Sequence, residues 1–145
     1  MPYSRRVAEV DVDEFERWLA AARRAVGAAR LQAEHGFHEW ACFLAEQSAQ
    51  LGVKGLLHGI GAPAWGHDLP VLCEQARELV GGPWPDEAGR WAERLSRYYI
   101  PTRYPDAVPG RIPGDRYSAT DSGEALFDAE ALLDAVERTW TELSG

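Results

Sequence analysis

The residues with the greatest capacity for chemistry lie in one short segment around two prolines, Tyr98-Tyr99-Ile100-Pro101-Thr102-Arg103-Tyr104-Pro105-Asp106. An arginine offers a planar cation that can pair with phosphate through two parallel hydrogen bonds. Tyrosine rings offer flat faces on which a nucleobase can stack. The prolines restrict the backbone, so a ligand need not supply all of the ordering free energy. These residue types indicate a binding loop. The alternative is a rigid connection whose tyrosines pack on the body of the protein.

The charge of the chain is uneven along its length. A net charge of −8 over 145 residues argues against a broad nucleic-acid-binding surface. Between Arg90 and Arg116, however, six arginines outnumber three acidic residues, which leaves this region at +3. The excess is compatible with a local anion site. Because 14 of the 15 basic residues are arginine, a solvated arginine-rich face is the alternative.

Two side chains outside the loop are further candidates for ligand contact. Lys54 is the only lysine of the chain and shares one polar strip of a predicted helix with Gln47, Gln50 and His58. It either reaches a ligand phosphate or extends its amine into solvent. His67 stands beside Asp68 just before another predicted helix, where it either contacts a ligand or anchors the loop.

No metal or other cofactor site is predicted. His35 and His38 are separated by Gly36, and no acidic or cysteine cluster accompanies them at ligand spacing. Cys42 and Cys73 lie in apolar helical patterns, so we expect two reduced, buried thiols.

Five helices must position these residues. Apolar stripes at the helical period predict them over residues 13–35, 38–58, 68–80, 86–99 and 121–143. The first and last should begin at the capping-box pairs Asp13–Glu16 and Asp121–Glu124. No period-two pattern persists, so the predicted class is all-α. The expected fold is an up-and-down bundle with a long proline- and glycine-rich loop, residues 101–120, before the last helix.

The second predicted helix is apolar or small nearly all round, and it should therefore be central. Gly52 and Gly55 inside it each cost about 1 kcal/mol relative to alanine. Another helix should approach closely at these positions, from the same chain or from a second subunit. The small residues are thus one reason to expect a homodimer.

The length predicts a single domain over residues 1–145, with residues 1–12 as a flexible N-terminus. No run approaches the roughly 18 apolar residues of a membrane helix. The first residues lack the apolar stretch of a secretory signal. We therefore expect a cytoplasmic protein that has no membrane partner.

The loop resembles that of the small prokaryotic HEPN-domain proteins, whose members carry a very similar Tyr-Ile-Pro-Thr-Arg-Tyr-Pro run after the fourth helix. Residues 39–49 with 53–57, and residues 65–69, fit the same family, and the resemblance extends from about Phe15 to Leu143. It implies the HEPN helical fold, a homodimer and a nucleotide or phosphorylated ligand. It also implies action beside a minimal nucleotidyltransferase, in the manner of toxin–antitoxin pairs. The implied ligand-binding residues are Arg97, Tyr99, Thr102, Arg103 and Tyr104, with Lys54 and His67 farther out.

Many HEPN proteins are ribonucleases in which an arginine holds the phosphate and a nearby histidine moves the proton. In this chain Arg97 is followed by Thr102 at the histidine position and by Tyr104 two residues later. Threonine has no group that titrates near neutral pH, so enzymatic activity by this route is not expected. Two alternatives remain open. One is a ribonuclease that uses Tyr104 or His67, although the acidic charge disfavours RNA, and the other is an interaction module without a small ligand.

Overall fold

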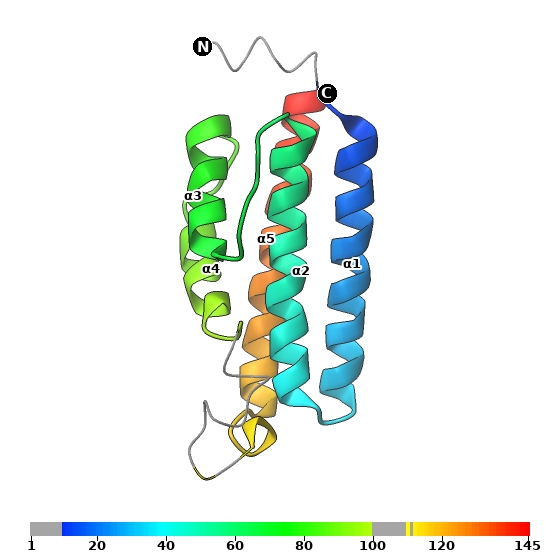
Figure 1. Ribbon diagram of the computed structural model, residues 1–145, viewed down its shortest axis with the longest axis vertical. Helices are drawn as coiled ribbons and strands as arrows, with labels where there is room; N and C mark the ends of the chain where they lie inside the picture. The colour runs from blue at the N-terminus through cyan, green and yellow to red at the C-terminus, as the bar shows by residue number, and fades with distance from the viewer. Residues whose placement is uncertain (1–9, 100–109, 111) are drawn as a thin grey trace.

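A computed structural model describes residues 10–99, 110 and 112–145 of the chain. Figure 1 shows an elongated helical bundle over these residues. The α-helices are α1 (Val12–Glu34), α2 (His38–Gly59), α3 (Leu69–Val80), α4 (Ala88–Ser96) and α5 (Ala119–Ser144). A 3-10 turn, η3 (Pro113–Asp115), precedes α5. No strand occurs within the described ranges, so the prediction of an all-α fold with five helices is confirmed.

Helix α2 is the centre of the bundle, as its apolar surface predicted. It contacts each of the other four α-helices. Figure 1 shows α1, α2 and α5 side by side along the long axis, with α3 and α4 on one flank. After α2 the chain runs back along the bundle before α3 begins. This return places the start of α3 near the end of α4, where the candidate site lies.

Two helices begin earlier than the capping boxes predicted. Asp11, not Asp13, caps α1, and its carboxylate accepts a hydrogen bond from the backbone N–H of Glu14 at 3.0 Å. The backbone N–H of Asp11 also donates to the carbonyl of Gly59 at 2.7 Å, which ties the start of α1 to the end of α2. Ser118 caps α5 in a reciprocal pair with Asp121. The same residue spacing occurs twice in each region, and the earlier copy is the one used.

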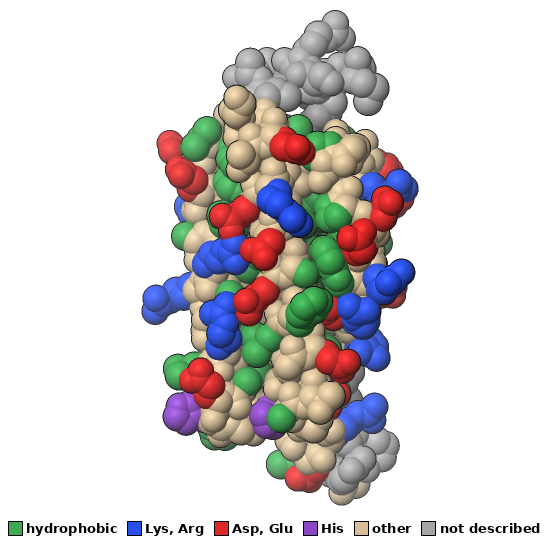
Figure 2. Space-filling view, turned by 180° about the vertical axis from the view of Figure 1, so that it is seen from behind, with side chains coloured by type: hydrophobic (Ala, Val, Ile, Leu, Met, Phe, Trp, Pro, Cys, Tyr) green, Lys and Arg blue, Asp and Glu red, His purple; other side chains and the backbone are tan. Residues whose placement is uncertain are grey.

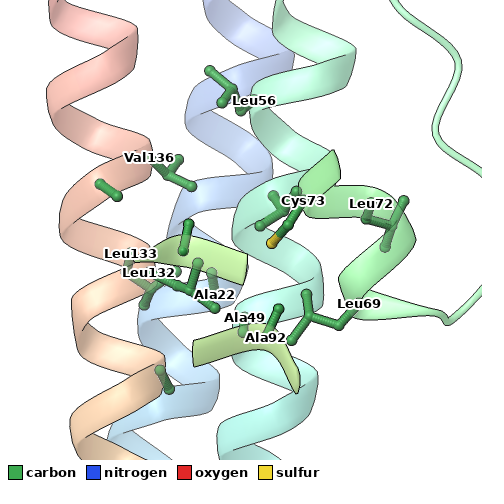
Figure 3. Close-up of a cluster of buried hydrophobic side chains, with 14 of the residues drawn as sticks. Ala22, Ala49, Leu56, Leu69, Leu72, Cys73, Ala92, Leu132, Leu133 and Val136 are labelled. Carbon is green, nitrogen blue, oxygen red and sulfur yellow. The ribbon is translucent and has the colours of Figure 1, made fainter. Parts of the chain in front are cut away.

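Interlocking aliphatic side chains fill the centre of the bundle (Figure 3). Leucines and valines of α2, α3 and α5 reach essentially zero exposure, among them Leu56, Leu69, Leu72, Leu133 and Val136. Full burial of such a side chain contributes roughly 1.5–3 kcal/mol. The buried apolar residues of the helices therefore form one continuous core.

The glycines of α2 admit neighbouring helices of the same chain. A Cβ atom at Gly55 would lie 2.6 Å from the Cβ of Trp18 on α1, and one at Gly52 would collide with Leu133 on α5. The predicted close approach at these positions is confirmed. Because α1 and α5 supply the neighbouring atoms, these glycines no longer argue for a second subunit.

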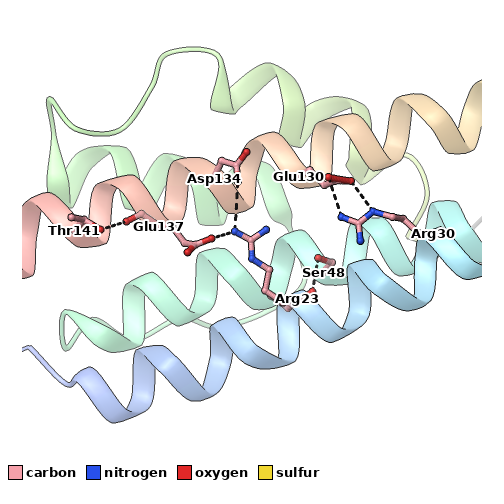
Figure 4. A network of polar contacts seen from close by, with 8 residues as sticks. Arg23, Arg30, Ser48, Glu130, Asp134, Glu137 and Thr141 are labelled. Atoms are coloured by element: carbon pink, nitrogen blue, oxygen red, sulfur yellow. Dashed lines mark hydrogen bonds and ion pairs between the residues drawn. The ribbon is translucent and has the colours of Figure 1, made fainter.

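Ion pairs join α1 to α5 along the outside of the bundle (Figure 4). Arg23 pairs with Glu137 and lies 3.5 Å from Asp134, and Arg30 lies 3.0 Å from Glu130. All of these side chains are at least one third exposed, so each pair contributes little to stability. Figure 2 shows basic and acidic side chains interspersed on one face of the molecule, without a continuous basic surface there.

The described helices include none that combines the length and apolar character needed to cross a membrane.

Candidate functional site

The structure describes four of the seven residues predicted to bind a ligand, namely Arg97, Tyr99, Lys54 and His67. The other three, Thr102, Arg103 and Tyr104, lie outside the described residues. The site is therefore built from the two ends of the loop and from the elements beside them.

Helix α4 ends at Ser96, and Arg97 follows it as the C-terminal cap residue. Arg97 is exposed, and its Nε donates to the carbonyl oxygen of Arg94 at 3.1 Å. In the described parts of the chain no carboxylate lies within ion-pair distance of its guanidinium. Within the described ranges, the one hydrogen bond of the Arg97 side chain is therefore to a backbone carbonyl and not to an acidic group.

Tyr98 turns inward and meets Tyr117, which lies between η3 and α5. The two ring centroids are 5.8 Å apart at an interplanar angle of 73°, an edge-to-face contact. The guanidinium carbon of Arg97 lies 5.6 Å from the centre of the Tyr98 ring, and that of Arg116 lies 5.9 Å from the centre of the Tyr117 ring. We call these four residues the arginine–tyrosine cluster. It joins the two ends of the loop.

Burial governs the ionisation of the two rings in the cluster. It raises the pKa of Tyr98 to about 12, against the opposing effect of the Arg97 charge. Burial also raises the pKa of Tyr117, and Arg116 opposes that rise. Both hydroxyls therefore stay protonated at neutral pH.

Arg116 resembles Arg97 in lacking an acidic partner among the described residues. The nearby carboxylate of Asp121 is engaged by Ser118, whose backbone N–H and hydroxyl donate to it at 2.8 and 3.1 Å. Two guanidiniums that have no carboxylate partner in the described part of the chain therefore flank one pair of tyrosines. Such an arrangement suits a phosphate or carboxylate ligand.

Sequence reasoning missed Arg116 and Tyr117 as site residues. Arg116 entered the count of arginines around the loop, but nothing in the spacing links it to Arg97, 19 positions earlier. The available signal was its position directly after the proline-rich segment, next to a tyrosine.

Tyr99 points away from Tyr98 and stacks on His67, another predicted site residue. The ring centroids are 5.3 Å apart and the planes are inclined by 18°. Both rings border a surface hollow of about 590 Å³ between the start of α3 and the end of α4. The structure thus brings together two candidates that are far apart in sequence.

A chain of polar side chains runs from His67 into the protein. The Nδ1 atom of His67 lies 3.3 Å from Oε1 of Gln50, whose Nε2 donates to Oε2 of Glu46 at 2.6 Å. Gln47 donates to the other oxygen of Glu46 at 2.9 Å. Glu46 is fully buried, and Gln50 is 3% exposed. Sequence reasoning assigned no role to Glu46, although it adjoins Gln47 and stands four residues before Gln50 on the predicted polar strip.

Lys54 is half-buried on α2. Burial lowers the pKa of its amine, and the negative charge of Glu46 counteracts this effect. The lysine is therefore associated electrostatically with the polar chain of α2. The structure shows no contact between Lys54 and His67 or Tyr99.

The described residues contain no group of three or more histidine, cysteine, aspartate or glutamate side chains arranged to hold a metal ion. Both thiols are free and buried, as expected. Burial raises the pKa of Cys42 and of Cys73 to about 12, so neither is a ready nucleophile or ligand at neutral pH.

Comparisons with known proteins agree on one family. The model of the HEPN domain matches residues 15–139. The TT1696 protein of Thermus thermophilus is 37% identical, with a TM-score of 0.81 over 86% of this chain and 97% of that chain. No curated protein is similar enough to count as a match.

Two further solved structures bear HEPN names. ST0689, an archaeal HEPN homologue, is 32% identical, with a TM-score of 0.70 over 85% of this chain and 94% of that chain. A HEPN domain protein from Thermotoga maritima is 29% identical, with a TM-score of 0.67 over 83% and 94% of the two chains. The helical order, the domain match and these relatives together show that the chain belongs to the HEPN-domain family.

Proposed function

We propose that this protein binds a nucleotide or another phosphorylated small molecule at the arginine–tyrosine cluster and the loop that the cluster joins. The observation that carries the proposal is the pair of guanidiniums, Arg97 and Arg116, that lack a carboxylate partner among the described residues and flank two tyrosines in edge-to-face contact. In the same proposal the protein is a homodimer and acts beside a minimal nucleotidyltransferase, in a toxin–antitoxin-like pair.

The chemistry of the cluster favours phosphate over a neutral ligand. Each guanidinium offers a planar set of donors that matches the oxygens of a phosphate. Tyr117 adds a hydroxyl that remains protonated at neutral pH. The chain as a whole is acidic, which disfavours a long polyanion such as RNA and leaves a compact anion as the better ligand.

Calorimetric titration with ATP tests this assignment. A charge-assisted hydrogen bond contributes roughly 1.5–3 kcal/mol. We therefore expect Arg97→Ala and Arg116→Ala each to weaken ATP binding by about 10- to 150-fold. Arg24→Ala is the matched control, because it removes the same charge from an exposed position on α1. It should leave the affinity within about 2-fold of that of the wild type.

The outcomes separate the alternatives. Equal losses in all three variants would indicate a general charge effect and would contradict a site at the cluster. No binding by the wild-type protein to ATP, GTP or inorganic phosphate would leave the interaction module as the surviving function. Melting curves of each variant show whether a loss of binding reflects a loss of folding.

Arg103 lies outside the described residues and belongs to the same proposal. It is the only residue between Pro101 and Pro105 that can form two parallel hydrogen bonds with a phosphate. Arg103→Ala should weaken ATP binding by about 10- to 150-fold. Arg103→Lys should recover only part of the loss, because an ammonium lacks the planar fork. A large drop in melting temperature with unchanged binding would instead identify a structural anchor.

The proposed partner is testable by genetics and by chromatography. A nucleotidyltransferase gene beside the gene for this protein would support the pairing. The two purified proteins should then elute together from a sizing column. Separate elution at micromolar concentrations would contradict a stable complex.

A further inference from the structure

The orientation of the Gln50 amide is determined by its two partners. Both oxygens of Glu46 accept from glutamine amides, Oε2 from Nε2 of Gln50 at 2.6 Å and Oε1 from Nε2 of Gln47 at 2.9 Å, so the amide nitrogen of Gln50 faces Glu46. The amide oxygen then faces His67 at 3.3 Å. Because an amide oxygen only accepts, the Nδ1 atom of His67 must carry the proton.

A proton on Nδ1 determines what His67 presents to its surroundings. In the neutral ring the other nitrogen, Nε2, then holds a lone pair and accepts a hydrogen bond. The buried carboxylate of Glu46 thus acts through Gln50 to select one tautomer of an exposed imidazole. Stacking on Tyr99 fixes the plane of the same ring.

The hollow next to His67 has the character of a site for a hydrogen-bond donor. About 590 Å³ is within the range of small-molecule pockets. Pro70 and Val71 give it an apolar wall, and Val71 is 59% exposed. Its charged lining residues are Asp68 and Glu93, and no described lysine or arginine borders it. Phosphate is therefore disfavoured here, whereas amino and hydroxyl groups are favoured.

We propose that this hollow receives the nucleoside part of the ligand, with an amino or hydroxyl group of the nucleoside donating to Nε2 of His67. This inference rests on the proposed function, because it assigns the phosphate to the arginine–tyrosine cluster and the nucleoside to the other side of residues 97–99. Tyr99 and Val71 supply the surface on which the planar base lies.

The tautomer is measured first, by two-bond hydrogen–nitrogen correlation spectra of protein labelled with ¹⁵N-histidine. His67→Gln identifies the signal, and the pH is set so that the ring is neutral. In the wild-type protein we expect Nδ1 to be protonated and Nε2 to be free. Gln50→Met should remove this preference. Gln47→Met is the matched control, since Gln47 also donates to Glu46 but does not contact His67. A protonated Nε2 in the wild type would overturn the inference, even if Gln50→Met fails to fold.

Binding is measured next, with adenosine and inorganic phosphate as separate probes. Adenosine should shift the Nε2 resonance of His67, and phosphate should not. The proposed hydrogen bond from the nucleoside to Nε2 of His67 joins two neutral groups. Gln50→Met should therefore weaken adenosine binding by about 2- to 12-fold, and Gln47→Met should weaken it less.

An unchanged Nε2 resonance at saturating ATP would overturn the nucleoside site. ATP binding that still depends on Arg97 would then leave the proposed function intact, whereas the absence of all nucleotide binding would refute both.

Discussion

Burial controls the chemistry of the individual titratable residues of the core. Cys42, Cys73 and Tyr98 are each at most 5% exposed, and burial raises the pKa of each to about 12. Their protonated forms are the ones that the folded state accommodates. Two measurable consequences follow, one for reactivity and one for stability.

Thiol reactivity should report on unfolding. Since the thiolate is the reactive form and both side chains are shielded, Cys42 and Cys73 should react with a water-soluble disulfide reagent far more slowly than a free thiol at pH 8. In denaturant both should react rapidly. Fast labelling of either cysteine in the native protein would contradict its buried position.

Stability should fall at alkaline pH, and Tyr98 should account for part of the fall. Its pKa rises from an ordinary value of 10.0 to about 12 on folding. The folded state therefore retains the proton over a range in which the unfolded state has lost it. The resulting stabilisation is fully present below pH 10 and is lost as the pH approaches 12. Urea unfolding at several pH values should show a shallower decline for Tyr98→Phe than for the wild type.

Several residues of the candidate site could be predicted from the sequence, but the contacts that group them could not. Arg97, Tyr99 and His67 were recognisable as candidates from their types and from the family pattern. Their division into two surfaces depends on the direction in which Tyr98 and Tyr99 point after α4 ends, and that direction is set by packing. Glu46 and Arg116 were missed because each is linked to the site through a contact between residues distant in sequence, Gln50 with His67 and Tyr98 with Tyr117. Local spacing cannot reveal a contact such as that between Gln50 and His67.

At the scale of helices, α2 is positioned by close contacts that its glycines permit. A Cβ at Gly55 would meet the Cβ of Trp18, which cannot move without shifting α1. By contrast, at Gly27 on α1 no neighbouring helix comes within 4 Å of the position that a Cβ would take. Substitution by alanine should therefore change the stability of the protein in opposite directions at Gly55 and at Gly27.

Gly55→Ala should destabilise the protein by about 1–3 kcal/mol through overpacking. Gly27→Ala should stabilise it by about 0.5–1 kcal/mol, because it lowers the backbone entropy lost on folding within an exposed helix. Urea unfolding measures both changes. A Gly55→Ala variant as stable as the wild type would show that α1 and α2 are less tightly packed than described.

A partly buried ion pair fastens α4 to α5. Arg94 donates to both oxygens of Asp128 at 2.9 and 2.6 Å, and Asp128 is 2% exposed. The carboxylate raises the pKa of Arg94 through these hydrogen bonds. Because α4 leads directly into the site, this pair positions Arg97 and Tyr99 as well as the helix.

Asp128→Ala should destabilise the protein by about 1–3 kcal/mol, since it removes two charge-assisted hydrogen bonds from a partly solvated pair. Glu130→Ala is the control, because it breaks the more exposed pair with Arg30 and should cost less than about 1 kcal/mol. Thermal or urea unfolding distinguishes the two. Equal effects would contradict a special role for the contact between α4 and α5.

At the scale of the whole molecule, hydrophobic periodicity was sufficient to predict the all-α fold, the number of helices and the central place of α2. The predicted positions of the helix ends were less accurate. The predicted fourth helix extended to Tyr99, whereas α4 ends at Ser96. Tertiary contacts of Tyr98 and Tyr99 replace the last helical turn there. Hydrophobic periodicity in the sequence does not predict such contacts.

The homodimer is a prediction for the whole molecule. Light scattering at micromolar concentration should give about twice the chain mass of 16.1 kDa. Since α1 and α5 of the same chain fill the space beside Gly52 and Gly55, these two glycines are not the expected contact between subunits. A mass of one chain at all concentrations would contradict self-association.

Tyr98 and Tyr99 are neighbours in sequence, yet one ring meets Tyr117 and the other meets His67. The two surfaces are therefore separated by a single peptide unit. A rotation of that unit cannot reorient one ring without disturbing the other. The segment directly after α4 thus carries two adjacent rings that contact different parts of the protein. A ligand that displaces the backbone at Tyr99 would therefore also displace Tyr98, because the arginine–tyrosine cluster and the hollow beside His67 share this backbone connection.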